Sequence, residues 1–194
     1  MTRIAVLAGS TREGSWNRAL AAVAARALEA RGAEVTTLDL AAYDLPLYSA
    51  ALEANAFPAH ALRLKQMLSQ QAGLLLVTPE YNGSIPPLLK NAIDWASRPT
   101  DGEAMLALSA YRGKAAAVMG ASLSPFGGMR AVTHLRQILS TVQMLVIPEQ
   151  VQLPAAHLAF DEQGALKDAM VAGLVDLTAA SLVRVATALA PPGS

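Results

Sequence analysis

The stretch that decides the fold of this chain reads GLLLVTPEYNGSIPP and covers residues 73–87. Its first six residues form a short apolar run that is typical of a buried strand, and the turn formers Asn82 and Gly83 follow it. Pro86 and Pro87 then predict the start of a helix, because proline fits the first helical position. A strand followed by such a turn exposes backbone amides at the carboxyl edge of a sheet, where open α/β sheets bind ligands.

Short apolar runs and longer helical patterns alternate along the rest of the chain, which is typical of parallel βαβ units. Right-handed crossovers then favour an α/β fold, with a doubly wound five-stranded parallel sheet in the order 2-1-3-4-5 and helices on both faces. The stretch around Pro46 and Pro58 is expected to be irregular. Strands are predicted at residues 4–8, 34–38, 74–78, 114–119 and 144–147, and helices at residues 16–31, 59–72, 86–97, 128–142 and 161–189.

Length and composition narrow the class of protein. The 194 residues contain no linker-like stretch, so we expect one domain over residues 1–190 and a frayed tail at 191–194. Hydrophobic residues make up 53% and charged residues 15% of the chain, and the net charge is zero. This composition argues against disorder and against a nucleic-acid surface, so small molecules are the expected partners.

Several kinds of site and location are excluded by what the sequence lacks. The chain has no cysteine, which excludes disulfides, thiolate nucleophiles, iron-sulfur clusters and thiolate metal sites. The apolar run after Arg3 is too short for the core of a signal peptide. No run approaches the roughly 18 apolar residues of a membrane span, so we expect a cytoplasmic protein.

The loop after the first predicted strand reads GSTREGSWNR, residues 9–18, and favours a phosphate. Ser10, Thr11, Ser15 and Asn17 supply hydroxyl and amide donors, and the helix start adds free backbone amides with a partial positive charge. An ordinary helix cap at Ser15 is the alternative. Ser15 stands where a Walker loop requires lysine, and three spaced glycines are absent, so a monophosphate is favoured over a nucleoside triphosphate or a Rossmann-bound dinucleotide.

Two further loops open on the same sheet edge in this strand order. Residues 79–84 offer backbone donors and Tyr81 for stacking on an aromatic ring, although a tight turn at Gly83 is the alternative. Residues 120–128 read GASLSPFGG, and these small residues leave room for a planar group or form a plain flexible connection. Since neighbouring strands one and three lie at the switch point, their loops part and leave a crevice.

With these motifs the chain resembles the NAD(P)H-dependent FMN reductase family of flavodoxin-like quinone, chromate and azo-dye reductases. Residues 9–15 with Asn17, residues 79–84 followed by KNAIDW at 90–95, the Gly127-Gly128 turn and Pro148-Glu149 carry the resemblance, which covers nearly the whole chain. The resemblance implies noncovalently bound FMN and NAD(P)H as co-substrate. The cofactor-binding residues that it implies are Ser10, Arg12, Ser15 and Asn17 around the phosphate, Trp16 in the same loop, and Pro79, Glu80, Tyr81, Asn82, Gly83 and Ser122 around the isoalloxazine ring. Trp16 stands where many relatives have phenylalanine, and we expect it to keep the packing role of that residue.

The function that this resemblance implies is an oxidoreductase that passes hydride from NAD(P)H through FMN to quinones or similar small acceptors, including azo compounds, nitro compounds, chromate and free flavin. Because the flavin carries the chemistry, we predict no catalytic side chain and no metal ligand. His60, His134 and His157 have no ligand spacing. Arg12 and Arg98 are candidates for a cofactor phosphate, with solvated surface arginines as the alternative. The absence of a second redox centre predicts a ping-pong mechanism.

A flavodoxin-type one-electron carrier is the alternative function. Such a carrier would display a strongly acidic face for docking, whereas this chain has 15 acidic and 15 basic residues, so the enzyme is favoured. The resemblance also implies a homodimer or homotetramer. Apolar residues at 85–95 and 104–110 predict that the contacts between subunits involve the helices around residues 86–97 and 128–142.

Overall fold

Five parallel strands form one sheet in residues 1–100 and 102–190, the part of the chain that the computed structural model describes. The order is β2-β1-β3-β4-β5, which confirms the predicted α/β class and strand order. The strands are β1 (Arg3–Ala8), β2 (Glu34–Leu38), β3 (Gly73–Thr78), β4 (Ala115–Ala121) and β5 (Leu145–Leu153). The helices are α1 (Trp16–Glu29), α2 (Ala50–Asn55), α3 (Ala59–Ser69), α4 (Pro87–Ser97), α5 (Met129–Thr141) and α6 (Ala169–Leu189), with short 3₁₀ turns at Leu40–Tyr43 and Ala156–Leu158.

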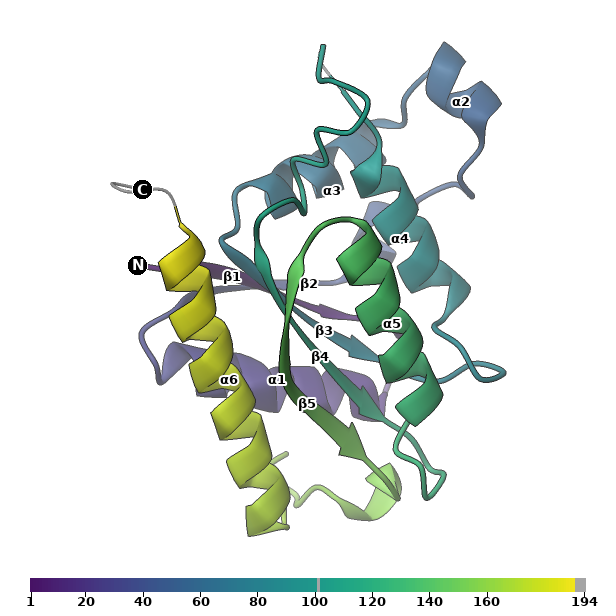
Figure 1. Cartoon of the computed structure of the whole chain (residues 1–194). Helices are drawn as coiled ribbons and strands as arrows, with labels where there is room; N and C mark the ends of the chain where they lie inside the picture. Colours follow the sequence, from purple (N-terminus) through teal and green to yellow (C-terminus); the bar gives the residue numbers. More distant parts are fainter. Residues whose placement is uncertain (101, 191–194) are drawn as a thin grey trace.

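The sheet is covered by helices on both faces, and each face has its own apolar core. All residues of β3 and β4 are buried, as expected for central strands of a parallel sheet. Leu75 and Val77 point into the core beneath α1 and α6, whereas Leu74 and Leu76 point into the core beneath α3, α4 and α5 (Figure 1). This two-residue alternation fixes the register of the sheet, since a slip by one residue would exchange the faces.

β5 is longer than predicted. The predicted strand at 144–147 ends before Pro148, because proline cannot donate a hydrogen bond to a neighbouring strand. In the structure β5 continues to Leu153, and its register with β4 shifts between Ala116 and Val118, opposite the residues around Pro148. β5 lies at the edge of the sheet, where such an irregularity is tolerated.

The last helix is shorter than predicted. α6 begins at Ala169 instead of 161, because the Asp168 carboxylate accepts hydrogen bonds from the backbone N–H groups of Met170 and Val171 and caps the helix there. Residues 160–166 form a turn closed by a bridge between Phe160 and Leu166. The predicted tail at 191–194 lies outside the described residues.

A short helix was missed within the stretch that was expected to be irregular. α2 is capped by the Ser49 hydroxyl, which accepts from the Leu52 N–H at 3.4 Å. All six of its residues are at least partly exposed, so no buried stripe marks it in the sequence. α3 ends at Ser69, three residues before the predicted end at 72.

α6 meets the length and composition of a membrane-crossing helix. Its most apolar 18-residue window has a mean hydropathy of 1.6, and a third of that window is buried inside the protein. In the structure α6 packs against β5 and α1, with Val175, Ala179 and Leu182 in the core. Its hydropathy is therefore partly explained by its place in the layer beside α1.

Candidate functional site

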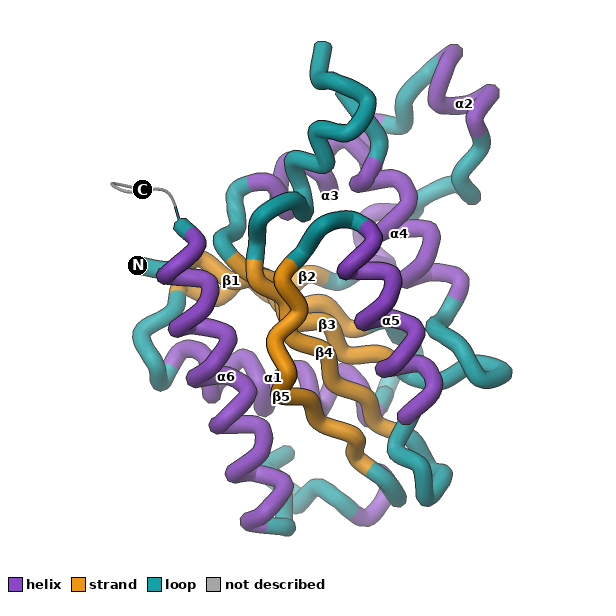
Figure 2. The backbone as a smooth tube through the Cα atoms, in the orientation of Figure 1, coloured by secondary structure: helices purple, strands orange, loops and turns teal. Residues whose placement is uncertain are grey.

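Three loops lie side by side at the carboxyl edge of the sheet, following β1, β3 and β4 (Figure 2). The register pairs Ala8 with Val77 and Thr78 with Gly120, so the three strands end at the same level. The Gly9 N–H donates to the Val77 carbonyl at 2.8 Å and fastens the first loop to β3. A side chain at Gly9 would place its Cβ 3.0 Å from Leu89 Cδ2, so glycine allows this close approach to α4.

The first loop delivers the uncapped start of α1 to this edge. Ser15 occupies the N-cap position, yet within the described residues its hydroxyl makes no capping bond to the helix. The first helical bond runs from the Ala19 N–H to the Ser15 carbonyl at 3.0 Å. The N–H groups of residues 16–18 therefore have no acceptor within the helix and carry its positive partial charge. The side chains of Ser10 and Ser15 are nearly buried beside them, and Arg12 is exposed.

Asn17 ties the first loop to the end of β4. Its side-chain amide donates to the Ala121 carbonyl and its side-chain oxygen accepts from the Ala121 N–H, both at 2.9 Å. Asn17 is only 4% exposed, so these bonds replace hydration that the amide loses. The sequence analysis predicted that Asn17 contacts a phosphate. In the structure, one N–H and the oxygen of the Asn17 side-chain amide are hydrogen-bonded to the Ala121 backbone.

Trp16 packs within the protein, as its predicted packing role requires. Its ring is stacked on that of Phe160, with centroids 6.0 Å apart and planes 6° from parallel. This contact joins the start of α1 to the segment after β5. The ring of Trp16 is therefore engaged in packing, while its backbone N–H belongs to the free start of α1.

The second loop is a tight two-residue hairpin. The Tyr81 N–H donates to the Ser84 carbonyl at 2.9 Å, and the Ser84 N–H donates to the Tyr81 carbonyl at 3.0 Å. Asn82 and Gly83 have φ values of 52° and 81°, the left-handed pair that a type I′ turn requires. The turn therefore explains the Asn-Gly pair, and it leaves Tyr81 half exposed at the rim of the edge.

Glu80 caps a helix from a neighbouring loop. Its Oε2 accepts from the backbone N–H groups of Arg130 and Ala131, at 3.0 and 3.3 Å, and its Oε1 lies 3.5 Å from the Arg130 guanidinium. In the described part of the chain no side chain of its own caps α5, whose N-cap is Gly128. A carboxylate there also stabilises the positive end of the helix dipole. The sequence placed Glu80 in a ligand platform and missed this role, because its partners are 50 residues away.

The third loop is held firmly against the end of β5. The Ser122 N–H donates to the Leu153 carbonyl at 3.0 Å, and the Ser122 hydroxyl accepts from the Ser124 N–H at 3.1 Å. Gly127 has a φ of 59°, and a Cβ there would lie 2.7 Å from the backbone carbon of Gln152. The Gly127 position of this loop thus serves close packing.

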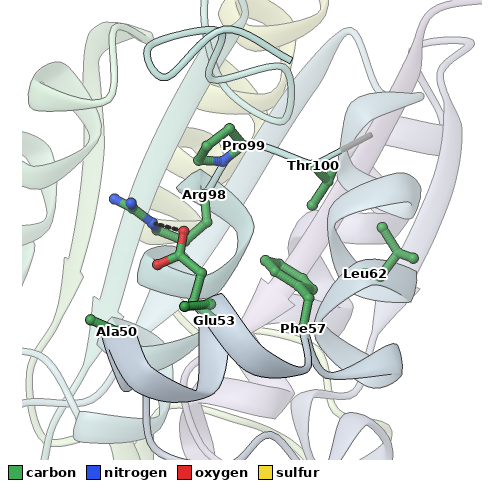
Figure 3. Close-up of a pocket in the computed structure, with 8 residues that line it drawn as sticks. Ala50, Glu53, Phe57, Leu62, Arg98, Pro99 and Thr100 are labelled. Carbon is green, nitrogen blue, oxygen red and sulfur yellow. Dashed lines mark hydrogen bonds and ion pairs between the residues drawn. The ribbon is translucent and has the colours of Figure 1, made fainter. Parts of the chain in front are cut away.

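Arg98, which was considered from sequence as a candidate for a cofactor phosphate, lies away from the three loops. Arg98 follows α4 at its far end, and its Nε donates to Glu53 Oε1 at 2.8 Å beside a cavity of about 510 Å³ lined by α2, α3 and the end of α4 (Figure 3). Partial burial acts to raise the pKa of Glu53, but the hydrogen bonds from Tyr48 and Arg98 outweigh it and lower this pKa below its ordinary value. Because the length of α4, about 16 Å, separates Arg98 from the three loops, the structure does not bring it to the predicted phosphate site.

His134, which has no ligand spacing in the sequence, makes a second contact with the hairpin. Its Nδ1 lies 3.1 Å from the Ser84 hydroxyl. Together with Glu80, it joins the hairpin to α5. Among the described residues, no group of three or more His, Cys, Asp or Glu side chains could hold a metal ion.

Comparison with known proteins places this geometry in a family. The sequence model of the NADPH-dependent FMN reductases matches residues 2–158. An NAD(P)H-dependent FMN reductase of Pseudomonas aeruginosa is 44% identical over 113 residues, which are 57% of this chain and 57% of that relative, less than two thirds of its length. A 2-hydroxy-1,4-benzoquinone reductase of a Burkholderia species is 36% identical over 82% of this chain and 80% of its own.

Solved structures give the same result. FerB, a flavoenzyme NAD(P)H:(acceptor) oxidoreductase from Paracoccus denitrificans, superposes with a TM-score of 0.81 at 34% identity, over 97% of this chain and 98% of its own. An archaeal flavodoxin superposes with a TM-score of 0.61 at 12% identity, over 96% of this chain and 99% of its own. The second likeness shows the flavodoxin-like fold alone.

Proposed function

This chain belongs to the NADPH-dependent FMN reductase family, and on that premise we propose that it is an oxidoreductase that moves hydride from NAD(P)H through FMN to a quinone or a similar small acceptor. The observation that carries the proposal is the uncapped start of α1, held between two other loops at the carboxyl edge. An anion and an adjoining planar group are what such an edge binds.

The residues of this edge fit FMN. The free N–H groups of residues 16–18 and the hydroxyls of Ser10 and Ser15 would hold its phosphate, with Arg12 adding positive charge. Tyr81, the Asn82-Gly83 turn and Ser122 would border the ring. Bound FMN would supply the redox chemistry, the transfer of hydride from NAD(P)H to an acceptor.

The chain's own contribution is to bind and orient the flavin and to keep the three loops in place. Asn17 fixes the start of α1 to β4, and Glu80 fixes the hairpin to α5. A phosphate group and a ring held by different loops keep their relative position only if the loops do not move apart. We therefore assign Asn17 and Glu80 positioning roles, with no acid, base or nucleophile required.

The acceptor and the kinetic order form the finer part of the proposal. A quinone is supported by the name of the Burkholderia relative and by the half-exposed Tyr81, whose ring offers a stacking surface. Azo compounds, nitro compounds, chromate and free flavin are the other small acceptors that we propose for the same open edge. A single open edge for both substrates supports a ping-pong order, in which NAD(P)H leaves before the acceptor enters.

A homodimer or homotetramer is also part of the proposal. Leu123 and Phe126 of the third loop and Met129 at the start of α5 are exposed, and so are Met105 and Leu106 in the apolar segment 104–110. The exposed apolar side chains at the start of α5 support a second copy there. Sedimentation at micromolar concentration tests this, and a clean monomer would contradict it.

Purified protein tests the activity. The chromophore is released by heat and identified by mass, and the holoprotein is then assayed anaerobically with NADH or NADPH and a panel of quinone, azo, nitro and chromate acceptors. We expect FMN and acceptor-dependent oxidation of the nicotinamide. FAD as the chromophore, or a bound flavin without any NAD(P)H oxidation, would contradict the enzyme and favour the one-electron carrier.

A further inference from the structure

The solvent-facing side of α6 is apolar. Met170, Leu174 and Leu177 are 77%, 43% and 52% exposed, and their spacing of four and three residues places them along one side of the helix. The exposed side of α1, by contrast, carries charged residues such as Arg18 and Arg26. Only a third of the most apolar window of α6 is buried inside the protein, so much of its hydropathy belongs to this outer side. Contiguous apolar surface of this kind marks an interaction site.

Asp176 and Arg184 are the charged residues of α6, and both are exposed. Within residues 1–100 and 102–190, neither lies within 4 Å of an opposite charge. Arg184 donates to the Ser181 hydroxyl at 3.5 Å, and this hydroxyl donates to Glu149 at 2.6 Å. A guanidinium has five N–H donors, so Arg184 retains donors for a second acceptor.

The spacing of these two charges is self-complementary. Asp176 and Arg184 lie four residues before and four residues after Ala180, which places each about 6 Å along the helix from it and about 40° to either side of its direction. If a second α6 lies antiparallel across a two-fold axis at Ala180, Asp176 of each copy is level with Arg184 of the other. The small side chain of Ala180 at the centre allows the two helices to approach. A parallel pair in register would instead set like charges against one another.

We propose that the exposed side of α6 is a two-fold interface on which a second copy of this chain docks with its own α6 antiparallel. Asp176 of each copy pairs with Arg184 of the other, and the apolar side chains of the two helices, such as Leu177, cover one another. Opposite charges that meet in this way fix the register and orientation of the contact. The pairing requires neither FMN nor the activity proposed for the carboxyl edge.

The α6 interface is distinct from the contact proposed at α5. The two helices cover opposite faces of the sheet (Figure 1), so one chain can use both surfaces at once. A single pair of helices buries less than the roughly 800 Å² per partner of a standard interface, so the α6 contact alone is weak and is expected at tens of micromolar or above. Dimers joined through α5 would be linked by α6 into a closed tetramer.

Because the chain has no cysteine, single introduced cysteines test the register directly under mild oxidation. Helix axes 8–10 Å apart would bring two facing Cα atoms at position 180 to about 4–5 Å, within reach of a disulfide, so Ala180→Cys should form a covalent dimer. Thr187→Cys is the control, since its two copies would lie about 21 Å apart along the helices, and it should cross-link at least about tenfold more slowly. A mixture of Gly173→Cys and Thr187→Cys should form the mixed dimer, because these positions are level across the axis and a Cβ at Gly173 meets nothing within 4 Å.

Charge reversal tests the ion pairs by sedimentation of FMN-saturated protein at about 100 µM, above the range expected for a weak contact. Asp176→Arg sets like charges against one another and should halve the mass of the assembly, whether the α5 contact makes the remaining unit a dimer or leaves it a monomer. The double variant Asp176→Arg with Arg184→Asp restores opposite charges and should recover the wild-type mass. Glu29→Arg, the same change of charge at an exposed position of α1, should leave the mass unchanged.

Three outcomes would overturn the interface. They are Ala180→Cys that cross-links no faster than Thr187→Cys, a mass that Asp176→Arg leaves unchanged, and a double variant that stays dissociated. Absence of the disulfide together with binding of the wild type to phosphatidylcholine vesicles would assign the apolar side of α6 to a lipid surface instead of a second copy.

Discussion

The two edges of this sheet carry positive charge by different means. At the carboxyl edge the donors are backbone N–H groups at the start of α1, and the side chains of Asn17 and Glu80 are engaged in holding loops together. At the amino edge helices end, and the cations Arg3, Arg112 and Lys114 gather there. Backbone N–H donors are positioned only when whole loops are in place, whereas each side-chain donor is positioned by its own residue. Substitutions at the carboxyl edge should therefore affect folding and binding together, and those at the amino edge should act locally.

The largest effect is expected where the third loop touches β5. Gly127→Ala would place a Cβ 2.7 Å from the Gln152 backbone and force a residue with φ of 59°, so the unfolding free energy should fall by about 3 kcal/mol. Gly14→Ala is the control, since Gly14 has a φ of 64° with nothing within 4 Å of its Cβ. Urea unfolding measures both variants. Equal losses would show that backbone conformation, and not close packing, limits the loop.

The next effect concerns the link between α1 and β4. Asn17→Leu leaves the Ala121 N–H and carbonyl unpaired in a buried place, and we expect a loss of about 2 kcal/mol of unfolding free energy. Asn17→Asp keeps an acceptor for the N–H but not a donor for the carbonyl, so it should lose less than Asn17→Leu. An Asn17→Leu protein as stable as the wild type would break the claim that these loops are fastened together.

A smaller effect is expected at the cap of α5. Glu80→Ala removes the acceptor for two helix N–H groups and should cost about 1 kcal/mol of stability, while Glu80→Gln retains an acceptor oxygen and should recover part of it. Glu13→Ala, at an exposed position of the first loop, is the matched control. FMN affinity should fall in Glu80→Ala and stay near the wild-type value in Glu13→Ala. Identical FMN affinity in all three variants would remove the positioning role of Glu80.

The last effect belongs to the amino edge and is measured as a pH dependence of stability. Burial, and then the charge of Arg3, lower the pKa of Lys114 to about 8 in the folded protein, so between pH 8 and the ordinary lysine range the unfolded chain binds more protons than the folded one. The contribution of Lys114 to stability therefore rises with pH over that window. Unfolding of the wild type and Lys114→Met at several pH values should show this rise in the wild type only. Parallel profiles would contradict the lowered pKa.

Local patterns were enough to predict most elements of the fold. Glu34–Leu38 is a strand and Pro87–Ser97 is a helix as predicted, because β-branched residues and an initiating proline act over a few residues. The end of β5 was missed because Pro148 breaks the local pattern but is tolerated at an edge strand. The start of α6 was placed too early, since the cap at Asp168 outweighs the helical composition before it.

The meeting of the three loops at one sheet edge was predictable, and their contacts only in part. That meeting follows from the strand order, and the Asn82-Gly83 turn follows from its own two residues. The ties made by Asn17 and Glu80 join residues 104 and 50 positions apart, and no pattern within either loop reveals such partners. The predicted cofactor contacts of Ser10, Arg12 and Ser15 stay predictions that binding measurements must test.

The central claim is that the carboxyl edge holds FMN through its phosphate at the start of α1, and comparison of FMN with riboflavin tests it most directly. Apoprotein is titrated with each flavin and the fluorescence of the isoalloxazine is followed. Several charge-assisted hydrogen bonds to the phosphate should make FMN bind one per chain and at least about 100-fold more tightly than riboflavin. Equal affinity for the two flavins, or no binding of either, would contradict the account.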